Sequence, residues 1–227
     1  MTRAARAACA IVVAFGVGRA RPAAAQSPEP GRFEAGIGPL WTGGASLGSR
    51  DANETTSTGG AFPLFSTSTE LSSAAGVEAR AGVRVWQRFE AEASASYGRA
   101  ELRTTVGNDS EGAAAVTAAE TIHQFTFNGG VVWYPPRPRV GTRLTPFVSV
   151  NAGYLRQLHE AATLAVTGHV YQVGGGVKYR LVSRPSSHVK GIGVRLDVRV
   201  AARSGGVAFD ARTRYAPTLG ASLFARF

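Results

Sequence analysis

Two adjacent stretches decide the fold: VEARAGVRVW at residues 77–86 and FEAEASASYG at residues 89–98. In the first, Val77 and Ala79 fall on one face of an extended chain, whereas Glu78 falls on the other. A repeat of two residues is typical of a β-strand with one apolar face, and it does not fit a helix. The two stretches therefore predict a pair of antiparallel strands joined by a tight turn.

The same alternation recurs along the chain. Further strands of about ten residues are predicted at residues 33–42, 123–133, 146–154, 171–181, 192–200 and 219–227. Short turns alternate with longer polar links at residues 43–76, 105–121, 156–170 and 201–214. An all-β, antiparallel up-and-down barrel has this arrangement when both termini lie on the side of the short turns. We expect eight strands, or ten if the first long link itself pairs.

Residues 1–26 have the features of a cleaved secretory signal peptide. Arg3 and Arg6 precede an apolar run at residues 8–18, and three alanines follow before Gln26. The run is too short for a membrane-spanning helix, which needs roughly 20 residues. We therefore expect export and a single barrel domain over residues 27–227. Cys9 is the only cysteine and lies in the leader, so disulfides, thiolate metal sites and cysteine nucleophiles are not expected.

Charged residues gather on one face of the predicted strands. This face carries Glu34, Glu78, Arg80, Arg84, Glu90, Glu92, Lys178, Arg180, Arg195, Asp197, Arg199 and Arg226. The opposite face is essentially uncharged at its central positions. A membrane barrel would turn the charges into its lumen, because Arg or Lys facing the bilayer midplane costs roughly 2–4 kcal/mol. A soluble barrel would turn them to water. The placement of the charges alone therefore does not distinguish a membrane barrel from a soluble one.

Aromatic residues favour the membrane barrel. Trp41, Tyr97, Trp133, Tyr154 and Tyr179 lie near strand ends on the apolar face. Transmembrane barrels carry such residues as girdles at the two membrane interfaces. A soluble barrel would instead expose a large apolar surface without reason. We predict a transmembrane β-barrel of the bacterial outer membrane, in contact with its lipids and lipopolysaccharide, and keep a soluble periplasmic lipid-binding barrel as an alternative.

The C-terminal sequence LGASLFARF carries a family resemblance. Its alternate residues Leu219, Ala221, Leu223, Ala225 and Phe227 resemble the signal that the bacterial barrel-assembly machinery reads. Residues 145–154, 173–179 and 194–199 also resemble strands of small OmpA-type and OmpW-type barrels. The resemblance implies an eight-stranded barrel that this machinery folds. We expect no peptidoglycan-binding domain of the kind that full OmpA proteins carry, and we expect a monomer.

The charges of the polar face allow two functions. They either line a path for ions or hydrophobic solutes, or pair with one another and fill the lumen. Pairing is expected because an uncompensated buried charge is costly, and a barrel of eight strands is just wide enough for side chains to fill. We therefore predict a structural or surface-interaction role with a plugged lumen, a small channel being the alternative. Replacing Arg195 or Arg199 by Ala should then lower barrel stability.

No motif names a reaction, so we expect no catalytic residues, metal or cofactor. His123, His159, His169 and His188 lack the His-x-Ser-Asn signature of lipid A deacylases. Glycines 174–176 lie inside a strand pattern and not in the strand–turn–helix setting of a phosphate loop. The arginines of residues 135–143 lack aromatic stacking partners, so no nucleic-acid binding is expected. Recognition is expected, if anywhere, in residues 43–76, which we otherwise interpret as a variable surface loop with at most a short hairpin.

Overall fold

The computed structural model describes residues 31–55, 57–136, 143–159, 165–183, 188–207 and 212–227. The predicted signal peptide lies outside these residues. The described chain contains ten strands: β1 (Phe33–Thr42), β2 (Ala45–Thr55), β3 (Ala61–Leu71), β4 (Ala74–Trp86), β5 (Phe89–Gly107), β6 (Val116–Trp133), β7 (Leu144–His159), β8 (Ala165–Ser183), β9 (Gly191–Gly205) and β10 (Arg214–Arg226). Among the described residues, no helix is long and apolar enough to cross a membrane.

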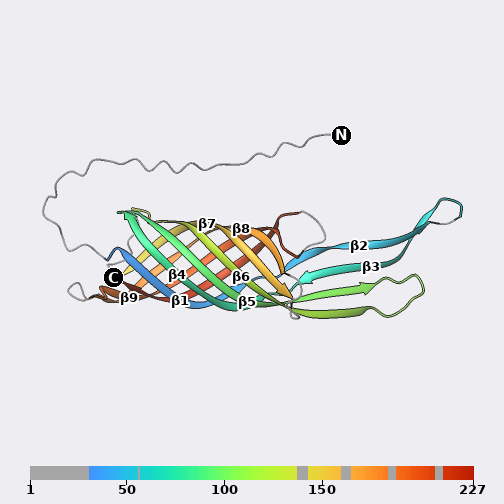
Figure 1. Ribbon diagram of the computed structural model, residues 1–227, viewed down its shortest axis with the longest axis horizontal. Helices are drawn as coiled ribbons and strands as arrows, with labels where there is room; N and C mark the ends of the chain where they lie inside the picture. Colours follow the sequence, from blue (N-terminus) through green and yellow to red (C-terminus); the bar gives the residue numbers. More distant parts are fainter. Residues whose placement is uncertain (1–30, 56, 137–142, 160–164, 184–187, 208–211) are drawn as a thin grey trace, which may run out of the picture.

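Eight of the strands close into a barrel. Around the ring the order is β4-β1-β10-β9-β8-β7-β6-β5, and the pairing of β5 with β4 completes it. All neighbouring strands are antiparallel, and sequence neighbours are joined in up-and-down fashion (Figure 1). The predicted all-β barrel of eight strands is confirmed.

Both ends of the described chain lie at one end of the barrel, which we call the turn end. The amide of Phe227 donates to the carbonyl oxygen of Phe33 over 2.8 Å. The two-residue turn between β4 and β5 and the connections from β6 to β7 and from β8 to β9 lie at this same end. The opposite end, called the loop end, carries the connections predicted to be long.

The loop end differs from the prediction, because the strands continue beyond the barrel. β2 extends the path of β1, and β3 that of β4, so that β3 pairs with the last part of β5 where β4 has ended. Together with the outer parts of β5 and β6 they form a four-stranded sheet in the order β2-β3-β5-β6, called the outer sheet. Figure 1 shows it projecting from one end of the barrel.

Two expectations are therefore wrong. Residues 43–76 are not a loop with a short hairpin, since β2 and β3 each have 11 residues. The ring strands are also longer than expected, reaching 19 residues in β5 and β8, which shortens the other three long links. The physical reason for the hairpin is that most of β2 and β3 is exposed on both faces, so polar residues occupy both and the apolar alternation disappears. The count of ten holds for the whole sheet, but the two additional strands lie outside the ring.

The barrel turns its apolar face outward. Ile37, Val150 and Val198 are between 59% and 60% exposed on the outer wall. The alternate positions point inward and are mostly polar, as the burial pattern of β9 shows. At the loop end the interior becomes apolar, where Leu47, Leu71, Ala74, Ala100 and Ile122 form a buried cluster. The wall thus inverts the usual polarity of a soluble protein.

The outer sheet should be separable from the barrel. Gly48 and Thr69 are cross-strand partners, so an Asn-Gly turn can replace residues 49–68 while Leu47 and Leu71 stay in the buried cluster. We expect the shortened protein to keep a heat-dependent shift in gel mobility and the urea midpoint of the full chain, because the ring pairs without these residues. Loss of the shift would show that closure of the barrel needs the hairpin.

Candidate functional site

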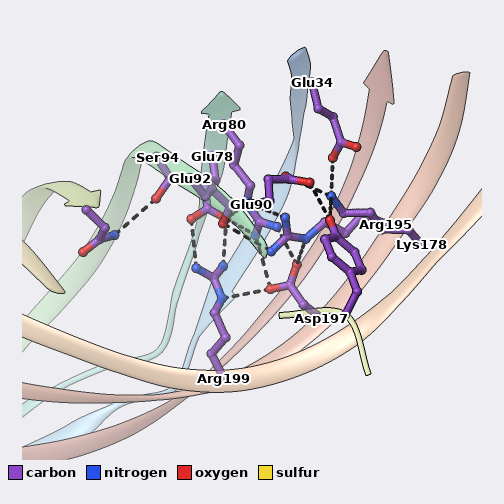
Figure 2. Close-up of polar contacts among 12 residues, drawn as sticks. Glu34, Glu78, Arg80, Glu90, Glu92, Ser94, Lys178, Arg195, Asp197 and Arg199 are labelled. Atoms are coloured by element: carbon purple, nitrogen blue, oxygen red, sulfur yellow. Dashed lines mark hydrogen bonds and ion pairs between the residues drawn. The ribbon is translucent and has the colours of Figure 1, made fainter. Parts of the chain in front are cut away.

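The structure places the predicted lumen charges in the interior. Nine are buried: Glu34, Glu78, Arg80, Glu90, Glu92, Lys178, Arg195, Asp197 and Arg199. They project from β1, β4, β5, β8 and β9 toward the barrel axis (Figure 2). Arg84, Arg180 and Arg226 are half-buried and lie at the turn end, where they line a cavity. No predicted member points to the outer wall.

Asp197 is the centre of the larger group of charges. Its Oδ1 accepts a hydrogen bond from Arg80 Nη1 over 2.7 Å, and its Oδ2 lies 2.8 Å from Arg199 Nε. Arg195 Nε lies 3.3 Å from Oδ1. One buried carboxylate therefore contacts three guanidinium groups, two from its own strand and one from β4 across the lumen (Figure 2).

Glu78 and Glu92 balance the remaining positive charge of these arginines. Arg199 binds Glu78 through two nitrogens, with distances of 2.7 and 3.0 Å to the two carboxylate oxygens. Arg80 also donates to Glu78, from Nε over 2.9 Å. Arg195 forms an ion pair with Glu92, which comes from the wall opposite β9. Paired carboxylate and guanidinium groups of this kind form strong, directional hydrogen bonds.

A second group surrounds Lys178. Its Nζ lies 3.2 Å from Glu90 Oε1, donates to the Tyr134 hydroxyl oxygen over 2.7 Å, and pairs with Glu34. The Tyr134 hydroxyl in turn donates to Glu90 over 2.6 Å. Arg226 reaches the second oxygen of Glu34 over 2.7 Å. Strands from three sides of the ring thus meet on one ammonium group.

Sequence reasoning missed two members of these groups, Tyr134 and Gln172. The Gln172 side-chain oxygen accepts from Arg199 Nη1 over 2.9 Å. Both lie at positions where alternation points inward, Tyr134 directly after the end of β6 and Gln172 six residues before Lys178 on β8. Extending the count of inward positions past the predicted strand end would have found Tyr134.

Glycines on the inner wall make room for the charges. A Cβ atom at Gly220 would lie 2.9 Å from Asp197 Oδ2 and 3.0 Å from Arg80 Nη2. A Cβ at Gly176 would lie 2.9 Å from that of Asp197. Close packing, and not a phosphate loop, therefore explains the glycines of β8.

The aromatic residues and the assembly signal lie on the outer wall. Trp41, Tyr97 and Tyr154 are near the loop end, whereas Trp133 and Tyr179 are near the turn end. Tyr97 packs on Phe125 with ring centroids 5.0 Å apart. The predicted assembly-signal residues occupy alternate positions along β10 and the residue after it, on the outward side. Leu219, Leu223 and Phe227 are exposed there.

The arrangement fills the lumen with paired charges. Among the described residues, no group of three or more His, Cys, Asp or Glu side chains is placed to hold a metal ion. The buried carboxylates face arginines and Lys178, and these pairs join strands that are not neighbours in the ring. Side chains from opposite walls thus meet in the middle of the lumen.

Comparison with known proteins gives structural likeness alone. No protein-family model and no curated protein matches the chain. The fold is similar to that of neisserial surface protein A, at 13% identity and a TM-score of 0.45, covering 86% of this chain and 97% of the other.

Two further solved structures are similar. The Yersinia pestis attachment invasion locus protein Ail, solved with the heparin analogue sucrose octasulfate, has 10% identity and a TM-score of 0.41, covering 86% of this chain and 99% of Ail. The outer membrane protein AlkL has 13% identity and a TM-score of 0.38, with coverage of 92% and 97%. The chain thus has a low-identity likeness to outer-membrane β-barrel proteins, and its role has to be argued from its own geometry.

Replacing Asp197 by Ala should strongly destabilise the barrel. Removing one partner leaves three buried guanidinium groups with excess positive charge, and such a loss costs about 3–5 kcal/mol. Urea unfolding of the refolded protein in detergent measures this free energy. The control is Glu101→Ala, which breaks an exposed ion pair with Arg103 and should cost less than about 1 kcal/mol. Equal effects of the two variants would contradict the account of the interior.

Replacing Gly220 by Val should crowd the same carboxylate. Overpacking of a filled interior costs about 1–3 kcal/mol. The matched control is Gly129→Val on the outward side of β6, where a Cβ would meet nothing within 4 Å. We expect the urea midpoint to fall for the first variant and to stay or rise for the second. A fall in both would point to a backbone effect and not to lumen packing.

Proposed function

We propose that the protein is an integral outer-membrane barrel whose lumen is closed by ion pairs and whose role is structural or interactive, not catalytic. The proposal rests on the pairing of charged side chains from opposite walls inside the barrel. The outer wall between the aromatic residues is uncharged. The rigid barrel then holds the outer sheet above the membrane.

The outer wall supports membrane insertion. Aromatic residues form one girdle near the turn end, with Phe89 and Trp133, and another near the loop end, with Tyr97 and Tyr154. Tyr97 lies eight residue steps along β5 from Phe89, which at about 3.3 Å per step and a tilt of roughly 40° gives about 20 Å of height. The apolar band of outer-membrane barrels is about 25 Å tall. A soluble lipid carrier would need the opposite wall polarity.

Orientation follows from the two ends. Outer-membrane barrels have short periplasmic turns and longer extracellular connections. The turn end, with Phe33 and Phe227 side by side, therefore faces the periplasm, and the outer sheet faces the exterior. In this orientation the C-terminal residues of β10 are the segment offered to the assembly machinery during export.

The loop-end rim supports contact with lipopolysaccharide. Arg99 is the cross-strand partner of His123, and Arg156 and His169 follow at diagonal positions on β7 and β8. Because the strands are tilted, these diagonal neighbours lie at similar height, just above the aromatic girdle. Arg99 Nε donates to the Tyr97 hydroxyl over 2.9 Å, which fixes it beside the wall. These four side chains are suited to the phosphates of an outer leaflet.

The side chains that fill the lumen favour a closed scaffold rather than a channel. The two groups centred on Asp197 and Lys178 cross the barrel one above the other. Beyond them the apolar cluster around Ile122 fills the loop end. A solute entering from the turn end would have to displace both groups and then the cluster.

The outer sheet is the part of the molecule suited to binding a macromolecule. β2 has a neighbour on one side alone over most of its length, and β6 has its β7 partner only from Ile122 onward. Exposed phenylalanines, Phe62 and Phe65, lie on β3 at 39% exposure. Open strand edges and exposed aromatic rings are common features of binding surfaces.

Planar-bilayer recording tests the closed lumen. We expect no stable unitary current from the purified folded protein, under conditions in which a general diffusion porin conducts. A reproducible unitary conductance would establish the channel alternative. Recovery of the protein from the periplasm without detergent would instead contradict membrane insertion itself.

A further inference from the structure

A cavity of about 710 Å³ opens at the turn end of the barrel, and we call it the vestibule. Its floor includes Tyr134 and Phe224. Among the described residues that line it, every charged side chain is basic: Arg84, Arg88, Arg143, Lys178, Arg180 and Arg226. Residues far apart in the chain therefore place six cations around one space.

Two carboxylates lie beneath the lining and are already engaged. Glu34 pairs with Lys178 and, through its other oxygen, with Arg226 at 2.7 Å. Glu90 contacts Lys178 through one oxygen and accepts from Tyr134 through the other. Among the described side chains, six basic groups line the vestibule, and the carboxylates paired with them are Glu34 and Glu90, so positive charge predominates there.

The surroundings strengthen the attraction for an anion. A cleft of one charge sign with low-dielectric walls concentrates the field and raises the local concentration of the opposite ion. Arg84 is held in place, because its guanidinium lies 4.7 Å from the centre of the Tyr134 ring and 3.7 Å from Glu90. Guanidinium groups match the geometry of phosphate oxygens and bind them in pairs.

We propose that the vestibule binds a phosphorylated compound carrying at least two negative charges. The predominance of positive charge favours a multivalent anion over a monovalent one, and the volume lies in the range of small-molecule sites. The ligand stops at the floor, because Lys178, Glu34 and Glu90 close the way inward. The site is therefore a terminal pocket and not the entrance of a path. Two sources share this chemistry, a phospholipid headgroup of the adjoining leaflet and a free phosphate compound.

The test titrates inorganic pyrophosphate into the refolded mature barrel in a neutral maltoside detergent, with isothermal calorimetry as the readout. Arg88→Gln and Arg180→Gln each remove one charge from the lining. Arg50→Gln removes the same charge from exposed β2 at the opposite end. We expect each vestibule variant to weaken binding about tenfold or more and Arg50→Gln to leave it unchanged. The heat-dependent mobility shift verifies that every variant is folded.

Two results would overturn the proposal: no binding to the folded wild-type protein, or an equal loss in all three variants, which would mean unspecific charge attraction. The source follows from repeating the titration in phosphatidylcholine vesicles with and without phosphatidylglycerol. Weaker pyrophosphate binding in the presence of phosphatidylglycerol supports a headgroup, and unchanged binding supports a free phosphate compound. Bilayer conductance reports on the closed lumen separately, so either idea can fail alone.

Discussion

The contact of Asp197 with three arginines is the interaction on which the structure depends. It joins β9 to β4, and through Glu78 and Glu92 the same arginines join β9 to the strands of the opposite wall. Buried ions are costly to remove from water, and only full pairing compensates that cost. The group therefore requires a closed ring with this register, because a slip by one residue would turn the charges of a strand onto the outer wall.

The need to pair buried charges inside and to keep charges off the outer wall changes the polarity of the strand faces along the barrel axis. Where hydrocarbon is expected to meet the wall, outward positions are apolar, inward positions are charged, and glycines such as Gly220 leave the space that the large side chains need. Beyond the loop end both faces of the sheet have water, and hydroxyl side chains replace the alternation, as in the hydrogen bond between Thr105 and Thr117. At the turn end the charged side chains among the described lining residues are all basic, which gives the vestibule its positive charge.

Much of this arrangement could be predicted from sequence, because period-two patterning records which side of a strand faces an apolar environment. Residues 33–42 form the predicted strand without change. The outer sheet could not be found in this way, since β2 and β3 have buried positions only where they join the barrel and are exposed on both faces over most of their length. The charged side chains could be assigned to the lumen, but their partners could not. Arg195 and Lys178 are direct cross-strand neighbours of like charge, and each finds its carboxylates across the lumen.

The proposed membrane insertion requires the outward face of the barrel, and not the inward face, to contact hydrocarbon. With Cys9 as the only cysteine and Cys9 in the predicted leader, single cysteines can be placed on β9 at Val198→Cys, Val200→Cys and Ala201→Cys and spin-labelled in vesicles. The account predicts that labels at the first two positions are reached by oxygen dissolved in lipid and shielded from a water-soluble nickel reagent, while the label at the third is shielded from both. Strong access of the nickel reagent to positions 198 and 200 would show that this face lies in water, and would contradict the account.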